Sequence, residues 1–308
     1  MFYVILLYAL FASVFTIAKT GLEYTQPFFL VASRMLLAGV LLIGYQYGFK
    51  GERFISSTKA WRRVICLAIF NIYLTNAFEF WGLKYLTSFK TCFIYSLSPF
   101  VSTLLSYFMF NERLSWRKWS GLLIGFAGFV PILLSQSSTE ELTGHFFVFS
   151  WAEMSVMAAA VCSVYGWIVL KQLVNEEGYT PLMANGLSML IGGAVALGHS
   201  LAVETWDPVP VTSYLPFFEC TLLMIIISNM ICYNLYGTLL KKFSATFMSF
   251  AGFTTPLFTA LFGWFFLGEV VTWPFYVSFG IVFSGLMIFY QEELKHIYRL
   301  QRPQVSKS

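Results

Sequence analysis

Apolar residues fill most of the chain in runs of about 20 positions, separated by short polar intervals. A helix of about 20 apolar residues spans the roughly 30 Å hydrocarbon core of a bilayer. The pattern therefore predicts an all-α integral membrane protein without a separate soluble domain. We expect ten transmembrane helices, near residues 2–19, 27–47, 63–83, 88–110, 117–135, 146–170, 180–203, 212–239, 244–267 and 272–291.

The two halves of the chain resemble each other. Residues 97–128 superpose on residues 254–285 without a gap at a single offset of 157, and Pro99 then aligns with Pro256. Repeats of this kind recur in secondary transporters, in which two halves move around a shared central site. We predict a first five-helix repeat, a second five-helix repeat and a polar tail, over residues 1–136, 146–291 and 292–308.

The positive charges predict the orientation of the chain in the membrane. With the N-terminus inside, fifteen of the 19 Lys and Arg residues fall in cytoplasmic segments, and only Lys19, Lys84 and Lys90 fall outside. Cytoplasmic loops carry such an excess, so both termini are expected in the cytoplasm. Because each half holds five spans, the second repeat enters the membrane upside down, which makes the repeat an inverted one.

Composition excludes several classes of function. The chain is 58% hydrophobic and 11% charged, with a mean hydropathy of +0.71, whereas soluble domains are roughly 45–50% apolar and about 25% charged. The five cysteines form no CxxC pair and the three histidines lie at segment ends, which predicts no metal site. No span contains an aspartate and no Gly-rich phosphate loop occurs. We therefore expect no enzyme activity, no cofactor and no nucleic-acid partner.

Two charged residues fall inside predicted spans. Arg34 lies about seven residues into the second span from its outer end, and Glu79 lies about five residues from the outer end of the third. A lone charge at the bilayer centre costs roughly 2.5–3.5 kcal/mol on insertion scales, so a partner is expected. The two side chains either form an ion pair that holds the bundle together or contact a substrate directly.

Four asparagines occupy matching places in the two halves. Asn71 and Asn76 in the third span are echoed by Asn229 and Asn234 in the eighth, with the same spacing of five. Amides facing lipid would leave polar groups unsatisfied, so these faces are predicted to look inward. They serve either as hydrogen-bonding contacts between helices or as ligand contacts. Together with Arg34 and Glu79 they form the candidate substrate site, and two tyrosines could supply ring faces, Tyr95 and Tyr233.

Other polar and small residues inside or beside the spans are predicted to shape the helices. Pro99 and Pro256 each free a backbone carbonyl and kink their helix, which predicts a cavity wall there. Glu112 and Glu269 are expected to accept hydrogen bonds from the start of the helix that follows each of them.

Two further patterns predict packing and membrane contacts. The ridge of Gly121, Gly125 and Gly128 predicts close helix packing first and a dimer face second, which leaves monomer or homodimer undecided. Trp81 and Trp167 lie near span ends and are interpreted as interfacial anchors.

The residues described above resemble those of the drug/metabolite transporter superfamily, and within it the EamA-type transporters. The resemblance rests on the ten spans, the twice-repeated Pro and Glu separated by twelve residues, and the Arg in the second span. Residues 82–128 resemble the fourth-helix signature of that branch. The chain departs from the pattern at Phe11-Ala12-Ser13, where a Trp-Gly-like pair is usual, and at Ser188, where the second half lacks the Arg.

The resemblance implies a secondary transporter in a bacterial inner membrane that moves a small organic metabolite by alternating access. The whole sequence also resembles a subgroup from obligate intracellular bacteria that exchanges S-adenosylmethionine for S-adenosylhomocysteine, so uptake of S-adenosylmethionine is the leading expectation. Export of amino acids or drug-like cations is the alternative within the family. A membrane receptor or scaffold is the alternative from another class.

Overall fold

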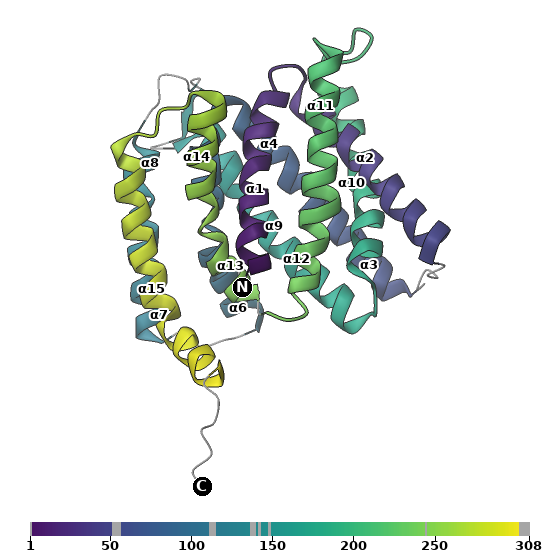
Figure 1. Cartoon of the computed structure of the whole chain (residues 1–308). Coiled ribbons are helices and arrows are strands. Elements are labelled where there is room, and N and C mark those ends of the chain that lie inside the picture. Colours follow the sequence, from purple (N-terminus) through teal and green to yellow (C-terminus); the bar gives the residue numbers. More distant parts are fainter. Residues whose placement is uncertain are drawn as a thin grey trace. The chain divides into compact units, whose positions relative to one another are not determined.

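The computed structural model describes residues 2–50, 57–110, 115–135, 140, 143–146, 149–243 and 245–301. Eight helices in these ranges are long and apolar enough to cross a membrane (Figure 1). The other two predicted spans also form helices, but each is divided into two shorter pieces. The all-helical, ten-span fold expected from the hydrophobic pattern is confirmed.

The helices of the first predicted repeat follow the apolar runs closely. Pro27 lies in the first turn of its helix, where the missing N–H costs nothing, and Ser57 and Ser115 cap two others through their hydroxyls. The elements are α1 (Phe2–Gly21), α2 (Pro27–Tyr45), the π-helical η1 (Gln46–Lys50), α3 (Thr58–Leu67), the π-helical η2 (Ala68–Leu74), α4 (Thr75–Tyr85), α5 (Ser88–Tyr95), α6 (Ser98–Phe110), α7 (Trp116–Gly128) and α8 (Val130–Leu133).

The second repeat opens differently from the prediction. A short antiparallel pair, β1 (His145–Phe146) and β2 (Phe149–Ser150), precedes the sixth span, so the helix begins at Trp151 rather than at 146. Ser150 and Glu153 form a reciprocal capping box that fixes this start. The helices are α9 (Trp151–Glu176), α10 (Pro181–Val203), α11 (Tyr214–Met224), the π-helical η3 (Ile225–Cys232), α12 (Tyr233–Leu239), α13 (Ala245–Gly252), α14 (Thr255–Leu267) and α15 (Trp273–Gln301).

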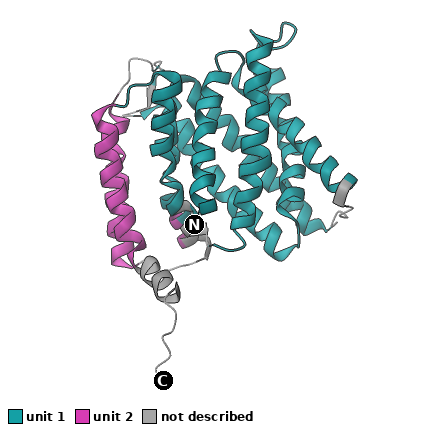
Figure 2. Cartoon of the chain, viewed as in Figure 1, with its two compact units in different colours: residues 1–102, 137–271 teal, residues 103–136, 272–308 magenta. Residues whose placement is uncertain are grey.

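The chain divides into two compact units, which Figure 2 distinguishes by colour. The larger, unit 1, comprises residues 1–102 and 137–271, and unit 2 comprises residues 103–136 and 272–308. Each unit draws on both sequence repeats. The division by contact therefore cuts across the division by sequence.

Small residues bring the helices of unit 1 close together. A Cβ added at Gly39 or Gly193 would meet the facing backbone at 2.9 Å, so α2 and α10 pack almost in backbone contact. Gly82 on α4 lies in the same way against Ala152 and Val156 on α9. Close approach of this kind compensates for the weak hydrophobic drive between helices in lipid. Outside these contacts, large apolar side chains such as Leu41 and Leu222 are exposed, as lipid contact requires.

Unit 2 is held together by the glycine ridge. A Cβ at Gly121 would lie 2.6 Å from the carbonyl oxygen of Gly285, and one at Gly285 would lie 2.5 Å from the backbone nitrogen of Gly125. Ser278 on α15 also contacts α8, because its Oγ accepts a hydrogen bond of 3.1 Å from the Ile132 N–H. The prediction of close helix packing at this ridge is confirmed, with α15 as the partner of α7.

Two helices of the repeated segment are interrupted next to their prolines. Between α5 and α6 the break falls at residues 96–97, just before Pro99. Between α13 and α14 it falls at residues 253–254, just before Pro256, which lies in the first turn of α14. The two breaks occupy matching places in the repeat.

Glu269 does cap the start of a helix, but the helix differs from the predicted one. Its carboxylate accepts hydrogen bonds from the Ser88 N–H at 2.7 Å and the Ser88 Oγ at 2.6 Å, at the beginning of α5. The expected partner was the next helix along the chain, α15. Sequence order could not reveal that α14 lies against α5, where Gly263 leaves room for the carboxylate. Glu112 lies outside the described residues.

Candidate functional site

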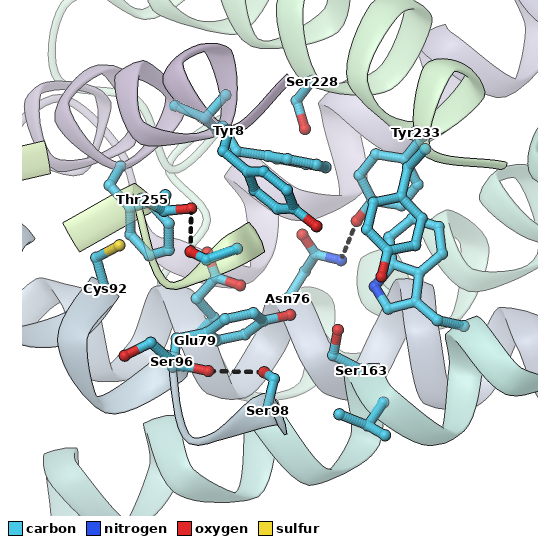
Figure 3. A pocket seen from close by; sticks show the side chains of 18 of the residues that line it. Tyr8, Asn76, Glu79, Cys92, Ser96, Ser98, Ser163, Ser228, Tyr233 and Thr255 are labelled. Atoms are coloured by element: carbon cyan, nitrogen blue, oxygen red, sulfur yellow. Dashed lines mark hydrogen bonds between the residues drawn. The ribbon is translucent and has the colours of Figure 1, made fainter. Parts of the chain in front are cut away.

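A cavity lies within unit 1 with an empty volume of about 1080 Å³, counting the space open to solvent. Pockets of roughly 300–1,000 Å³ accommodate most small organic ligands. Residues from both sequence repeats surround the space, and Figure 3 shows Tyr8, Asn76, Glu79 and Tyr233 around it. The lining comes from α1, α2, α4, α5, α6, α9, η3, α12, α13 and α14.

The two charged residues predicted from the sequence both line this cavity. Arg34 is only 1% exposed and Glu79 is half-buried. Both belong to the described residues, yet no ion pair within 4.0 Å joins them. Of the two alternatives drawn from the sequence, a direct Arg34–Glu79 ion pair is not what the structure contains.

Arg34 is held by neutral neighbours. Its Nη2 donates a hydrogen bond to the Asn76 Oδ1, and its guanidinium carbon lies 4.5 Å from the centre of the Phe80 ring. The Nε and Nη1 atoms are buried and have no hydrogen-bond partner. Two nitrogens of this buried cation therefore have unused N–H donors.

Asn76 connects this cation to the backbone and to the opposite wall. Its Nδ2 donates to the carbonyl oxygens of Ile72 at 2.7 Å and Asn71 at 3.2 Å. It also donates to the Tyr233 hydroxyl at 3.3 Å, as Figure 3 shows. The π-helical segment η2 supplies those carbonyls. A π turn is wider than an α turn and is common at functional sites. The amide therefore closes the wide turn and joins α4 to α12.

An aromatic cluster forms another part of the wall. Trp167 on α9 lies 4.2 Å from Tyr236 and 5.3 Å from Tyr233, measured between ring centres. Phe11 approaches both tyrosines edge-on at 6.4 Å. The interpretation of Trp167 as an interfacial anchor is wrong, because the residue lines the cavity. Its position near a span end by residue count had suggested the anchor, but α9 is 26 residues long and runs past it.

The remaining predicted residues divide into those at the cavity and those behind it. Tyr95 lines the cavity, and its ring centre lies 6.2 Å from that of Phe15 in an edge-on arrangement. Asn71, Asn229 and Asn234 are buried but are not among the lining residues. The prediction of one common face assumed 100° per residue, whereas η2 and η3 are π-helical and rotate the side chains differently.

The second repeat contains a residue that the sequence reading missed. Asn185 on α10 donates from its Nδ2 to the Asn234 Oδ1 at 3.1 Å. The Asn234 Nδ2 in turn donates to the carbonyl oxygens of Met230 at 2.9 Å and Asn229 at 3.1 Å. Asn185 thus makes the hydrogen bond in the second repeat that Arg34 makes in the first: each donates to the Oδ1 of the asparagine that follows the π segment. The signal was available as an amide in the seventh span, three residues before Ser188, where an Arg was sought.

The arrangement suits binding better than bond-breaking chemistry. Pro99 and Cys92 also line the cavity, and Ser98, Ser102 and Ser163 add hydroxyl groups. Within the residues that the structure describes, no group of three His, Cys, Asp or Glu side chains could hold a metal ion. The cavity offers a partly unpaired cation, an anion and aromatic faces, which together complement a zwitterion that carries a flat ring.

The model of the EamA-like transporter family matches residues 1–134 and 150–291. The chain belongs to the EamA-like transporter family. It is therefore a multi-pass membrane protein and a transporter of small molecules, not an enzyme, and the resemblance drawn from the repeated Pro and Glu residues is confirmed.

Individual relatives agree with the family match. The chain is 35% identical over 292 residues to a S-adenosylmethionine/S-adenosylhomocysteine transporter of Chlamydia muridarum, covering 94% of this chain and 91% of the relative. A protein of the same name from Chlamydia trachomatis serovar L2 is 36% identical, with 94% and 89% covered. One crystal structure of a protein, 18% identical, superposes with a TM-score of 0.66 over 98% of this chain and 97% of that one, which supports the fold alone.

Proposed function

We propose that this EamA-family transporter takes up S-adenosylmethionine across a bacterial inner membrane, in exchange for S-adenosylhomocysteine. The observation that carries the proposal is that one cavity contains aromatic rings together with a cation and a carboxylate that form no ion pair within 4.0 Å: Arg34, Glu79 and the cluster around Trp167. The two Chlamydia relatives, which are named S-adenosylmethionine/S-adenosylhomocysteine transporters, support it.

Three parts of the ligand have a complement in the cavity. The α-carboxylate would accept hydrogen bonds from the Nε and Nη1 of Arg34. The sulfonium cation would lie near the Glu79 carboxylate, which has no hydrogen bond or ion pair to any described residue. The adenine ring would stack at Trp167 and Tyr236, because aromatic pairs of this kind contribute about 0.5–1.5 kcal/mol beyond their buried area.

Transport would proceed by alternating access, with both termini in the cytoplasm. The fifteen-to-three distribution of positive charge supports this orientation. The interrupted helices at Pro99 and Pro256 support movement at matching places, since a break in the backbone hydrogen bonding permits a helix to bend. Export of an amino acid or a drug-like cation remains the competing function, because Arg34 and Glu79 would suit such ligands as well.

Exchange in proteoliposomes tests the proposal. Vesicles loaded with S-adenosylhomocysteine should accumulate radiolabelled S-adenosylmethionine faster than empty vesicles. Glu79→Gln should lower S-adenosylmethionine uptake about tenfold or more, because it removes a charge partner of the sulfonium. Exchange of S-adenosylhomocysteine, whose sulfur is neutral, should fall less.

The exposed Glu23, which does not line the cavity, provides the control variant Glu23→Gln, with parental rates expected for both compounds. A parental protein that transports neither compound would refute the proposal. Transport of an amino acid or a drug-like cation instead would favour the competing function.

A further inference from the structure

Asn76 holds Arg34 without neutralising it. The Arg34 side chain is 1% exposed, and its one hydrogen-bond acceptor is the uncharged Asn76 Oδ1. The other two guanidinium nitrogens, Nε and Nη1, are buried without partners in the cavity wall. Burying an unpaired charge is costly, and the cost falls when a counter-ion arrives.

The amide end of Asn76 explains why this position holds an asparagine. The Nδ2 donates to two carbonyl oxygens of the π turn of η2 and to the Tyr233 hydroxyl. An aspartate would keep the acceptor for Arg34 but would lose these donors and add a negative charge. Asparagine therefore does two tasks at once: it closes the π turn and presents a neutral acceptor.

The second repeat provides an internal control. The Asn234 Nδ2 donates to the two carbonyl oxygens of η3 in the same i−4 and i−5 pattern. Its Oδ1, however, accepts from the neutral Asn185, and neither residue lines the cavity. A substitution at Asn234 thus perturbs an equivalent π turn without touching a cavity charge.

We propose that Asn76 is a positioning residue that holds Arg34 through a neutral acceptor and not through a contact ion pair, so that the cavity selects ligands that bring their own carboxylate. The inference rests on the proposed function for the identity of the ligand. It adds that selectivity for the carboxylate depends on Arg34 and also on the neutrality of Asn76, which accepts its hydrogen bond. Asp at this position would supply the counter-ion internally and compete with the ligand.

The experiment compares Asn76→Asp with Asn234→Asp, using S-adenosylmethionine and its decarboxylated form as the ligand pair. Both variants lose the amide that closes a π turn, so general structural damage should be similar. Asn76→Asp should raise the KM for S-adenosylmethionine about tenfold or more, because a charge-assisted hydrogen bond is weakened, and should leave the KM for the decarboxylated form nearly unchanged. Asn234→Asp should change both values by the same factor.

The ratio of the two KM values decides the outcome. If Asn76→Asp changes the KM of both ligands by the same factor, the inference is overturned, because a purely structural role would produce that result. If Asn76→Asp does not fold, Asn76→Ser is measured instead. The serine keeps a neutral acceptor, and it should preserve the parental ratio at a lower rate. Loss of the ratio in Asn76→Ser would also overturn the inference.

A failure of the proposed function is recognisable separately. If the parental protein does not transport S-adenosylmethionine, thermal stabilisation is measured with amino acids and with the amines that their decarboxylation yields. Weaker stabilisation by the amino acids alone, in Asn76→Asp but not in Asn234→Asp, would support the role of Asn76 for another substrate. No preference for the carboxylate in the parental protein would overturn it.

Discussion

The third predicted span contains the π-helical segment η2, and the eighth contains η3. Each π segment is followed by an asparagine at the second position of the next helix. The side-chain amides of Asn76 and Asn234 donate to carbonyl oxygens four and five residues earlier. The surroundings differ. Asn76 accepts from Arg34 beside the cavity, whereas Asn234 accepts from Asn185 within the helix packing.

The difference distinguishes a role in supporting the fold, which both asparagines have, from the role in ligand recognition that we propose for the first half alone. Side-chain donors can satisfy backbone groups that irregular helix geometry leaves open, which matters greatly where lipid replaces water. Both halves use the asparagine in this way. Only the first half adds a charge beside the cavity, so we propose that both copies of the motif support the fold and that only the first contributes to ligand recognition.

The largest effect is expected when the first half is made to resemble the second. Arg34→Gln keeps an amide donor near Asn76 but removes the cation. Transport of S-adenosylmethionine, measured as kcat/KM in proteoliposomes, should fall roughly a hundredfold, as expected for loss of one partner of a buried charge pair. Asn185→Ser, the matched change in the second half, should alter stability more than kcat/KM. Equal losses of kcat/KM in both variants would contradict the assignment of recognition to one half.

A smaller loss is expected from the aromatic wall. Trp167→Leu keeps an apolar side chain but removes the stacking surface beside Tyr236, so the KM for S-adenosylmethionine should rise about tenfold. Inhibition of uptake by methionine, which has the amino-acid group but no adenine, should be unchanged. If Trp167→Leu weakens inhibition by methionine by the same factor as it raises the KM for S-adenosylmethionine, the adenine ring does not lie at Trp167.

Gly166 tests the packing behind η2. A Cβ at this position would lie 2.3 Å from the Asn71 Cβ and 2.9 Å from its Cα, so Gly166→Ala should lower the free energy of unfolding by about 1–3 kcal/mol. Gly198→Ala is the control, because nothing lies within 4 Å of its Cβ position. Thermal unfolding in detergent measures both. An unchanged midpoint in Gly166→Ala would mean that α9 can move away from η2 without cost.

The smallest effect concerns the link between the two halves. Tyr233→Phe removes the hydroxyl that accepts from Asn76 at 3.3 Å and keeps the ring beside Trp167. A hydrogen bond of this kind contributes about 0.5–1.5 kcal/mol, so the KM should rise less than about tenfold. A loss as large as that of Arg34→Gln would instead make the hydroxyl a direct ligand contact.

The sequence predicted the fold well because lipid imposes a simple rule on it. Runs of about 20 apolar residues could be counted directly, and small residues such as Gly121 revealed where helices approach. The charged residues Arg34 and Glu79 could also be found, because a charge in a span stands out against apolar neighbours. These predictions needed only local pattern.

The rest depended on geometry that local pattern does not encode. The asparagine spacing of five was visible, but the π turns that direct Asn76 to the cavity and Asn71 away from it were not. Asn185 was missed because the search followed the charge of Arg34 rather than its hydrogen-bonding role. Trp167 was misjudged because its distance from a span end was counted from the predicted boundary at residue 170, whereas α9 continues to Glu176.

A structure of the protein with S-adenosylmethionine bound would test the central claim most directly. The account predicts the ligand carboxylate within hydrogen-bond distance of the Arg34 Nε or Nη1, with Arg34 still bonded to Asn76 and the adenine ring against Trp167. A carboxylate bound away from Arg34, or a ligand outside the cavity between Tyr8 and Glu79, would contradict it.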